Sequence, residues 1–550
     1  MKALEGEASS QPAEASAGKA AVRKVVSFPV LLGTLLVTLV IAVVAGLLRD
    51  ASSANRDSIV PTIDVFEGDT WFHILVGEDI LKTHTFPTTD SYTFTVYGNE
   101  SIAHEWLGQI VMALTDHLRG LRALTFLFFV AASTLTLLLY YYSSLRCGNP
   151  KAAFLACLPM LTLLCAFFTL RPQLFGYGFF FLTMILVEHF RRGRTWTLWL
   201  LPPLFVLWVN THGSFVLGLL LLGFCWAAGL VGFQAGRLEA EAWTPRQRLH
   251  LEVAMLLCVL ALIATPYGTR IAGFTLHVLL GAPLGMTRIQ EYLPLGDERL
   301  RIFVVLFLAF LAAQVVMRPK YRLDEFALLL VTVYGTFVHR RLLLFSIPVF
   351  TPMLAALLAR WVPRYGQTKD RVLLNAVLIA AALATWVKFY PSRPVLQRAV
   401  ATAFPCGAVE YLQRHPVKGR MFNPDFWGAY LIRSLGRDHK IFIDGYSQRF
   451  EDAGVYEDYL RIIALHPDTP LLLRKYGVDA CLTYRWGALA TYLSRSPDWE
   501  QVYQDDLAVL FLRKSSPKAA CATNQDSLPG TEKSADHQVG PSARREGPAP

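Results

Sequence analysis

The chain has 550 residues, of which 53% are hydrophobic and 17% are charged, and its formal net charge is +10. Soluble globular proteins carry about 25% charged residues, so this composition argues against a cytosolic enzyme. The aromatic content of 12% argues against a disordered chain. A basic excess can indicate nucleic-acid binding, but in a membrane protein it is typical of loops that face the cytoplasm. The composition therefore indicates an α-helical polytopic membrane protein.

Eleven apolar runs are candidates for membrane-spanning helices, because a bilayer core of about 30 Å needs roughly 20 apolar residues per helix. In chain order they are residues 25–48, 124–142, 152–168, 174–187, 196–209, 215–231, 253–264, 302–316, 326–337, 342–358 and 372–387. The runs that end at Ala264 and Phe337 are the shortest of the set.

Lysine and arginine residues mark the inner loops of membrane proteins and thereby set the orientation. When the N-terminus is placed inside, the basic residues of the leader and of five short turns all fall on the inner side. These turns are represented by Arg146, Arg191, Arg246, Arg322 and Arg364. Eleven spans then leave the C-terminal region outside. We therefore predict a disordered cytoplasmic leader over residues 1–24 and a transmembrane domain over residues 25–390.

The first outer loop, residues 49–110, contains a predicted interfacial helix. Asp69 and His73 are four residues apart and share one face of a helix, while Phe72 and Leu75 contribute an apolar stripe. This pattern favours an amphipathic helix that turns Asp69 toward an aqueous cavity. An alternative interpretation is that Asp69 caps the helix and His73 is a solvated neighbour.

Further polar residues gather at the outer ends of the spans. They are His104 and Glu105 in the first outer loop, Arg171 after the third run, Asn210 and His212 after the fifth, Tyr267, Glu291 and Tyr292 after the seventh, and His339, Arg340 and Arg341 after the ninth. Basic residues are unexpected at an outer end, so the Arg340-Arg341 pair favours an anion site over a helix anchor. Structural alternatives stay open for the others, as interfacial, turn-forming or helix-capping residues.

Residues 391–514 are less apolar and are predicted to form a small soluble α/β domain on the outer face. The predicted strands are residues 440–443, 479–482 and 508–512, and a predicted helix is 458–465. The dipeptides Asp444-Gly445 and Asp505-Asp506 are interpreted as turns. Residues 515–550 are rich in Ser, Pro, Gly, Glu and Lys and are predicted to be a disordered tail.

An inside N-terminus, a long acidic first outer loop, about eleven spans and an outer soluble domain together resemble the GT-C class of membrane glycosyltransferases. The motif strings are similar to those of largely uncharacterised bacterial members of that class. They are Asp69-Thr-Trp-Phe-His73, His104-Glu105-Trp106-Leu107, Arg171-Pro-Gln173, Trp208-Val-Asn210, Pro266-Tyr267-Gly268, Arg340-Arg341, Trp427-Gly428-Ala-Tyr430 and Phe442-Ile-Asp444-Gly445. The class is distantly similar to oligosaccharyltransferase catalytic subunits, but this chain lacks their W-W-D-Y-G run.

The resemblance implies that a sugar moves from a polyprenyl-phosphate-linked donor to a glycan, lipid or protein acceptor by direct displacement. The attacking group loses a proton, which calls for a carboxylate base, and the departing phosphate calls for cations. Asp69 is the first candidate for the base and Glu105 is the second, with His73 or His104 orienting it. The candidates for binding the donor phosphate are Arg340, Arg341, Arg171 and His339, and those for the substrate cavity are Asn210, His212, Tyr267, Glu291 and Tyr292.

Cofactors and partners follow from the same motifs. The sequence contains no Walker A run, no G-x-G-x-x-G and no H-E-x-x-H, so it indicates no nucleotide cradle and no familiar metal motif. A divalent Mg²⁺ or Mn²⁺ ion, with Asp69 as a ligand, stays open. The expected partners are the lipid-linked sugar, membrane lipid and an acceptor, without nucleic acid, because the basic residues form no stripe with aromatic ones. A bacterial inner membrane with the C-terminal domain in the periplasm fits this assignment.

Two alternative functions stay open. One is a non-enzymatic transporter of lipid or polysaccharide, or a scaffold for envelope assembly. A transporter would place ionisable groups near the bilayer midplane, whereas here the polar residues gather at the outer ends, which favours the enzyme. The other is a polymer transferase like the O-antigen ligases, which would use a lipid-linked polymer as its donor.

Overall fold

The computed structural model describes residues 23–51, 65–165, 168–281 and 301–514. Most of the predicted leader and all of the predicted tail lie outside the described residues. Two of the predicted cavity residues, Glu291 and Tyr292, lie outside them as well.

Each of the eleven apolar runs coincides with a helix over most of its length, as predicted. The helices are α2 (Phe28–Ala51), α5 (Leu121–Cys147), α6 (Pro150–Cys165), α7 (Gln173–Arg191), η1 (Thr195–Leu200) with α8 (Leu201–Val209), α9 (Phe215–Ala228), α10 (Pro245–Ala261), α13 (Arg301–Met317), α14 (Leu323–Val338), α15 (Leu343–Leu358) and α16 (Val372–Phe389). Five described helices are long and apolar enough to cross a membrane, namely α2, α5, α7, α16 and α15 with its preceding turn η4 (Arg340–Leu342). The number of about eleven membrane crossings therefore stays a prediction.

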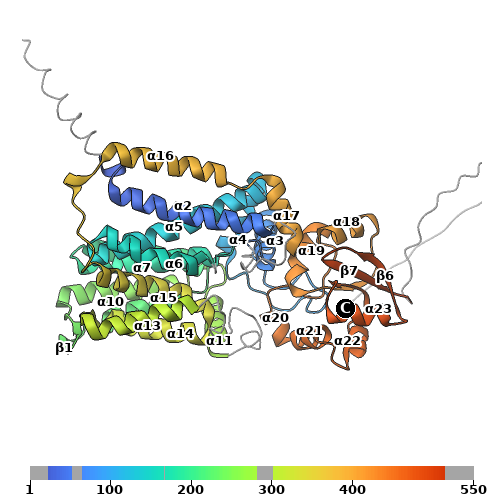
Figure 1. Ribbon diagram of the computed structural model, residues 1–550. Coiled ribbons are helices and arrows are strands. Elements are labelled where there is room, and N and C mark those ends of the chain that lie inside the picture. The colour runs from blue at the N-terminus through green and yellow to red at the C-terminus, as the bar shows by residue number, and fades with distance from the viewer. Residues whose placement is uncertain (1–22, 52–64, 166–167, 282–300, 515–550) are drawn as a thin grey trace, which may run out of the picture.

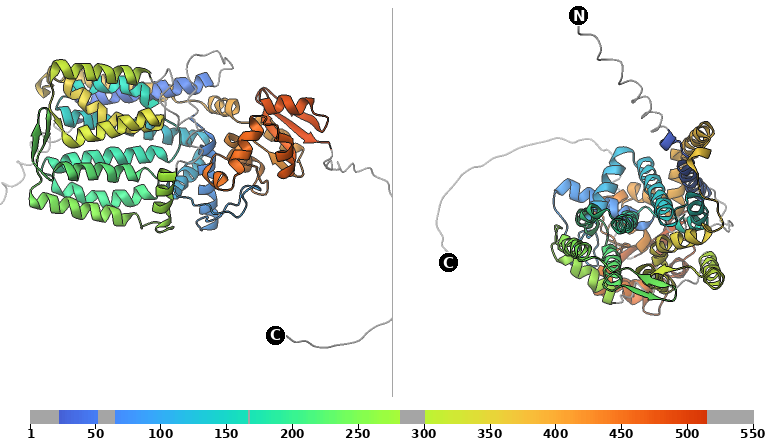
Figure 2. Two further views of the ribbon diagram at one scale, coloured as in Figure 1. Left: turned by 90° about the horizontal axis from the view of Figure 1, so that it is seen from below. Right: turned by 90° about the vertical axis from the view of Figure 1, so that its left-hand side faces the viewer.

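The long helices lie side by side and form one bundle (Figures 1 and 2). Several threonine hydroxyl groups inside them find partners within the same helix. Thr136 Oγ1 donates to the carbonyl of Ala132, and Thr183 Oγ1 donates to that of Phe179, each at 2.8 Å. Because lipid offers no hydrogen-bond partner, such internal bonds allow polar side chains within apolar helices. Two further elements are α11 (Arg270–Gly281) and the short turn η5 (Gln367–Lys369).

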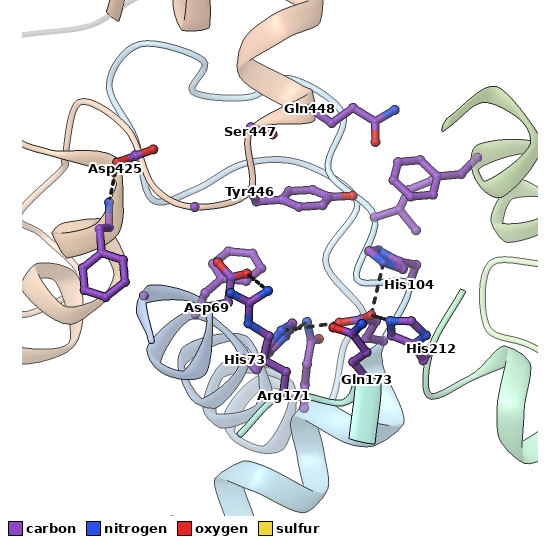
Figure 3. A pocket seen from close by; sticks show the side chains of 18 of the residues that line it. Asp69, His73, His104, Arg171, Gln173, His212, Asp425, Tyr446, Ser447 and Gln448 are labelled. Atoms are coloured by element: carbon purple, nitrogen blue, oxygen red, sulfur yellow. Dashed lines mark hydrogen bonds and ion pairs between the residues drawn. The ribbon is translucent and has the colours of Figure 1, made fainter. Parts of the chain in front are cut away.

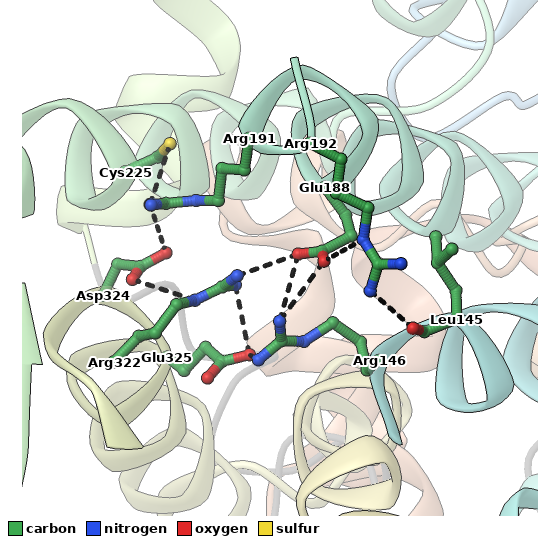
Figure 4. Close-up of polar contacts among 9 residues, drawn as sticks. All are labelled: Leu145, Arg146, Glu188, Arg191, Arg192, Cys225, Arg322, Asp324 and Glu325. Atoms are coloured by element: carbon green, nitrogen blue, oxygen red, sulfur yellow. Dashed lines mark hydrogen bonds and ion pairs between the residues drawn. The ribbon is translucent and has the colours of Figure 1, made fainter. Parts of the chain in front are cut away.

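Several of the basic turns predicted to face inward meet at one end of this bundle, in an inner arginine cluster (Figure 4). Glu188 in α7 pairs with Arg146 at 3.2 Å, and with Arg192 and Arg322 at 2.8 Å each. Arg146 and Arg322 also share Glu325. A small sheet of β1 (Phe233–Ala235), β2 (Leu238–Ala240) and β3 (Tyr321–Arg322) brings a further basic turn to the same end.

Helix α3 (Gly68–Thr83) confirms that residues 49–110 contain a helix, but its burial is not confined to one face as the amphipathic pattern predicted, and its place at the membrane interface stays a prediction. Trp71, His73 and Leu75 point in different directions around the helix, and all three are buried. The alternative of a solvated His73 is excluded by the same burial. Tertiary neighbours cover the helix on more than one face, so its sequence pattern alone does not show which face is exposed.

The start of α3 and its contact with α4 (Trp106–Arg119) fix where the polar residues lie. Glu67 is the N-cap residue, and its N–H donates to Thr70 Oγ1 at 3.1 Å, so Asp69 occupies the first turn instead of capping the helix. Gly77 lacks the Cβ atom that would overlap the backbone carbonyl of Gln109, which allows α4 to pack closely against α3.

The C-terminal region, residues 393–513, combines a mixed sheet with short helices. Its strands are β4 (Arg420–Phe422), β5 (Val478–Tyr484), β6 (Trp499–Gln504) and β7 (Ala508–Arg513), in the order β4-β5-β7-β6, with β4 parallel to β5 and the other pairs antiparallel. The helices are α17 (Arg393–Ala403), α18 (Cys406–Arg414), η6 (Asp425–Trp427), α19 (Gly428–Leu435), α20 (Gln448–Asp452), α21 (Val455–Ile463), α22 (Thr469–Lys475) and α23 (Ala488–Arg495).

Most of the local predictions for this region agree with the structure. The predicted strands at 479–482 and 508–512 lie in β5 and β7, and Asp505-Asp506 forms the turn between β6 and β7. The predicted strand at 440–443 is wrong. Ile441 forms only isolated bridges, because the N–H of Phe442 donates to the side chain of Asn423 at 2.9 Å instead of to a strand.

The C-terminal region is attached to α3 and α4 by ion pairs. Arg437 binds Glu78 at 2.8 Å and Asp79 at 3.0 Å. Arg433 binds Glu78 at 3.3 Å and Asp116. These contacts bring the C-terminal region against the same end of the bundle as α3.

Candidate active site

A cavity of about 350 Å³ lies where α3 and the start of α4 meet the C-terminal region, at the end of the bundle opposite the inner arginine cluster (Figures 1 and 3). Seven of the residues predicted from the sequence line it, namely Asp69, His73, His104, Glu105, Arg171, His212 and Arg341. The other lining residues are Gly68, Phe72, Ile102, Gln109, Gln173, Phe274, Asp425, Phe426, Gly445, Tyr446, Ser447, Gln448 and Tyr456. The structure therefore brings together polar residues from the outer ends of several helices.

Asp69 is the carboxylate most open to this cavity. Its side chain is 30% exposed and pairs with Arg171 Nη1 at 3.1 Å. Arg171 also binds Glu67, so two carboxylates share one guanidinium group. The positive end of the α3 dipole lies beside Asp69 too, because the residue is in the first turn.

Glu105 is a buried carboxyl group surrounded by three imidazole rings, as the dashed lines in Figure 3 indicate. Its Oε1 atom lies 3.4 Å from His212 Nε2 and 3.6 Å from His104 Nε2. Its Oε2 atom lies 3.4 Å from His73 Nε2. Burial raises the pKa of Glu105 to about 8, with a further increase from Asp69 and an opposing effect of Arg341.

Burial disfavours the protonated form of all three histidines. Burial lowers the pKa of His73 to about 3 and that of His104 to about 4, and it holds the pKa of His212 well below its ordinary value. The second ring nitrogens are held in place by neighbours. Gln109 Nε2 lies 3.3 Å from His73 Nδ1, and the N–H of Ser214 donates to His212 Nδ1 at 3.1 Å. With Nδ1 accepting, the proton of His212 is on Nε2, which faces Glu105.

These pKa shifts predict opposite pH effects on stability. Below pH 6.5 the unfolded chain binds protons that folded His73 and His104 do not, so stability falls as the pH drops. Above pH 4.5 unfolded Glu105 ionises while the folded group stays protonated up to about pH 8, so stability falls as the pH rises. Stability is therefore expected to be greatest near neutral pH.

Glu105→Gln is expected to abolish the loss of stability that accompanies rising pH and to leave the loss at acid pH unchanged. The free energy of unfolding of the variant, relative to wild type, should increase between about pH 5 and pH 8 by up to about 1.4 kcal/mol per pH unit. Thermal or denaturant unfolding of the purified proteins across this range measures the difference. Replacement of the exposed Glu100 by Gln is the matched control. Parallel pH profiles for wild type and Glu105→Gln would show that Glu105 is not held protonated.

Among the three predicted phosphate-binding residues at the start of α15, only Arg341 is a described lining residue of the cavity. His339 and Arg340 precede it in the chain and are partly buried outside the lining. The structure thus separates two adjacent arginines that the sequence does not distinguish.

Asn210 and Tyr267 were predicted to face substrate, but they connect loops beneath the cavity and are not described lining residues. The amide of Asn210 accepts from Trp106 Nε1 at 2.7 Å and donates to the carbonyl of Ala264 at 2.8 Å. The hydroxyl of Tyr267 donates to the carbonyl of Pro87 at 2.8 Å. Both polar groups are thus engaged within the protein, and a place in the substrate cavity stays a prediction for Asn210 and Tyr267.

The residues missed by the sequence analysis come mainly from the C-terminal region. One lining segment begins within the Asp444-Gly445 pair that was interpreted as a turn. It consists of Gly445, Tyr446, Ser447 and Gln448. The Asp444 carboxylate is buried and binds Arg449, which a simple surface turn would not do. The Asp-Gly pair was visible in the sequence, but nothing near it indicated a contact with Asp69.

Metal binding is not resolved by the geometry. Among the residues that the structure describes, no group of three or more His, Cys, Asp and Glu side chains is arranged to hold a metal ion. The Mg²⁺ or Mn²⁺ ion with Asp69 as a ligand stays a prediction.

No protein-family model and no curated protein sequence matches the chain. Similar solved structures include the oligosaccharyltransferase of Archaeoglobus fulgidus tethered with an acceptor peptide, at 12% identity and a TM-score of 0.49, covering 87% of this chain and 74% of that one. Another is ArnT from Cupriavidus metallidurans bound to undecaprenyl phosphate, at 12% identity and a TM-score of 0.49, covering 89% of this chain and 99% of that one. Both belong to the class that the motif strings resemble. At these identities and TM-scores, the function of the chain has to be argued from its own site.

Proposed function

We propose that the chain is a membrane glycosyltransferase that moves a sugar from a polyprenyl-phosphate-linked donor to an acceptor on the outer side of the membrane. The observation that carries this proposal is the convergence of Asp69, Glu105, Arg171 and Arg341 on one cavity. A sugar phosphate needs a base for the acceptor and cations for its leaving group, and this cavity offers both. Its volume of about 350 Å³ falls in the range of small-molecule sites.

Arg171 and Arg341 both belong to the described lining of the cavity, and both are candidates for the donor phosphate. Arg171 is already shared by Glu67 and Asp69, which compensate its charge. Arg341 lowers the pKa of Glu105, so its positive charge acts inside the cavity. In a poorly hydrated site, a charge-assisted hydrogen bond from a guanidinium group stabilises the departing phosphate more strongly than it would in water.

The geometry also ranks the two candidate bases. Burial raises the pKa of Glu105 and so favours its protonated, hydrogen-bond-donating form, while Asp69 is 30% exposed in the cavity and is the proposed base. In the proposed step the acceptor atom bonds to the anomeric carbon and gives its proton to Asp69. The bond from the anomeric carbon to the phosphate oxygen breaks, and its electron pair leaves with polyprenyl phosphate.

The five candidate spans contain no charged residue outside their first and last turns. A transporter would use ionisable groups near the bilayer midplane, so this distribution supports the enzyme instead. The orientation predicted by the basic turns puts the cavity on the outer side and the inner arginine cluster on the cytoplasmic side, and a bacterial inner membrane fits this arrangement.

The test uses the purified full-length protein in lipid nanodiscs with polyprenyl-phosphate sugars that carry a labelled sugar. Water can replace the unidentified acceptor, so the expected result is time-dependent loss of label from the lipid and an equal release of polyprenyl phosphate. Asp69→Asn is the control. Lipid movement between leaflets without cleavage would overturn the proposal in favour of a transporter. Turnover with lipid-linked polymers alone would identify a polymer transferase.

A further inference from the structure

The loop of residues 445–448 forms one wall of the cavity, although it is far from Asp69 in the sequence. Gly445 lies so close to Asp69 that a Cβ atom there would overlap the carboxylate. The Tyr446 ring stacks on Phe72, with ring centres 5.7 Å apart, and on His104, with ring centres 5.9 Å apart (Figure 3). The C-terminal region therefore reaches the groups proposed to carry out the chemistry.

Arg449 lies directly after this loop and is buried. Its guanidinium group pairs with Asp90 at 2.9 Å and with Asp444, and Nη1 donates to Ser101 Oγ at 3.3 Å. Asp90 and Ser101 belong to the first outer segment, while Asp444 and Arg449 belong to the C-terminal region. One side chain thus connects the two parts of the chain at the edge of the cavity.

Arg449 also contacts two aromatic rings that line the cavity, those of Phe72 and Tyr446. The guanidinium carbon lies 5.5 Å from the ring centre of Phe72 and 5.5 Å from that of Tyr446, within the range of cation–π attraction. On the other side of the loop, the N–H of Tyr446 donates to Asp444 Oδ1 at 3.0 Å. Arg449 and its partner Asp444 therefore both hold the base of this loop, in addition to the stacking of Tyr446 on Phe72 and His104.

We propose that Arg449 is a positioning residue that holds the 445–448 loop against Asp69, so that the C-terminal region completes the substrate cavity. The proposal rests on the proposed function, because it gives this loop the task of orienting the sugar. Ser447 and Gln448 present a hydroxyl and an amide on the same wall, groups that suit the hydroxyls of a sugar. Without Arg449, two buried carboxylates would lose their counter-charge, and the loop would move away from the cavity.

Arg437 provides a matched control. It also joins the C-terminal region to the first outer segment through two carboxylates, Glu78 and Asp79, and it does not line the described cavity. Loss of Arg437 weakens the same attachment between the two parts but leaves the loop in place. A general loosening of the C-terminal region and a specific loss of loop position can therefore be separated.

The first readout reports loop position without activity. Ser447→Cys is introduced as a reporter, and its labelling rate by a soluble maleimide is followed by mass spectrometry of the peptide that contains it. Arg449→Gln is expected to increase that rate by about tenfold or more, Arg449→Lys by less, and Arg437→Gln by less than about twofold. Equal rates for the Arg449 and Arg437 variants would overturn the proposal. Arg449→Lys keeps the charge and so remains informative if Arg449→Gln does not fold.

The second readout is turnover of the labelled polyprenyl-phosphate sugar. Arg449→Lys is expected to raise KM by about tenfold with a smaller change in kcat, and Arg437→Gln is expected to leave both near wild type. A faster labelling rate with no turnover in any protein, wild type included, would leave the positioning role of Arg449 intact and reject the proposed function. An unchanged KM in Arg449→Lys, with wild type active, would reject the positioning role instead.

Discussion

Asp69→Asn is expected to slow sugar transfer by about 100- to 10,000-fold, the range that loss of a general base produces. The amide keeps the shape of the side chain but cannot take a proton from the acceptor. The lost interaction belongs to the transition state, so kcat should fall while KM for the lipid-linked sugar stays close to wild type. Release of polyprenyl phosphate at saturating donor measures the effect.

Asp79→Asn is the matched control for this experiment. Asp79 lies in the same helix and makes an ion pair, but it is not among the described lining residues of the cavity. Its replacement should change kcat by less than about threefold, as is usual for substitutions away from the reacting groups. A wild-type kcat in Asp69→Asn would remove Asp69 from the mechanism and leave Glu105 and Asp425 as the carboxyl groups among the described lining residues.

Arg341→Ala is expected to weaken the binding of polyprenyl phosphate by about 10- to 100-fold, which corresponds to the loss of one charge-assisted hydrogen bond. The lipid phosphate without a sugar isolates this contact from the others. Arg340→Ala, one position away, should leave the Kd within about twofold, because Arg340 does not line the described cavity. Isothermal titration in detergent or in nanodiscs measures both values.

The comparison of the two arginines decides between two interpretations. Equal losses in both variants would indicate a general electrostatic attraction of the lipid head group to this end of the protein. A loss confined to Arg340→Ala would contradict the assignment of the phosphate to the cavity. Arg340→Lys and Arg341→Lys distinguish charge from geometry, since lysine keeps the charge but cannot form a bidentate contact with phosphate.

The helices of the bundle were largely predictable, because each apolar run is long enough to specify its helix locally. Residues 253–264, for example, identified α10, although the helix begins eight residues earlier at Pro245, where a Thr244 cap precedes it. Because the first residues of α10 are mostly polar, a hydropathy pattern does not show where the helix begins. Helix α3 was predicted to exist as well, but its burial depends on α4 and on α19, which no local pattern reveals.

The candidate site was predictable in part for a similar reason. Arg341 was found because arginine at an outer helix end is unusual, and Asp69 was found from its four-residue spacing to His73, features that are both visible in a single sequence. Asn210 was placed in the cavity because it also lies at an outer helix end, but its bonds to Trp106 and Ala264 use its amide within the protein. The 445–448 loop was missed because its importance arises from a contact with Asp69 that only the tertiary fold creates.

The inner arginine cluster has a consequence for how a long lipid chain reaches the cavity. Glu188 pairs with Arg146 and Arg322 from two other segments as well as with Arg192 four residues further on, so separating α5, α7 and the start of α14 at that end would remove two of the three partners of a buried carboxylate. We therefore expect α5, α7 and the start of α14 to stay together at the end that contains the inner arginine cluster. If the bundle opens to admit the lipid chain, we expect the helices to separate at the end that contains the cavity.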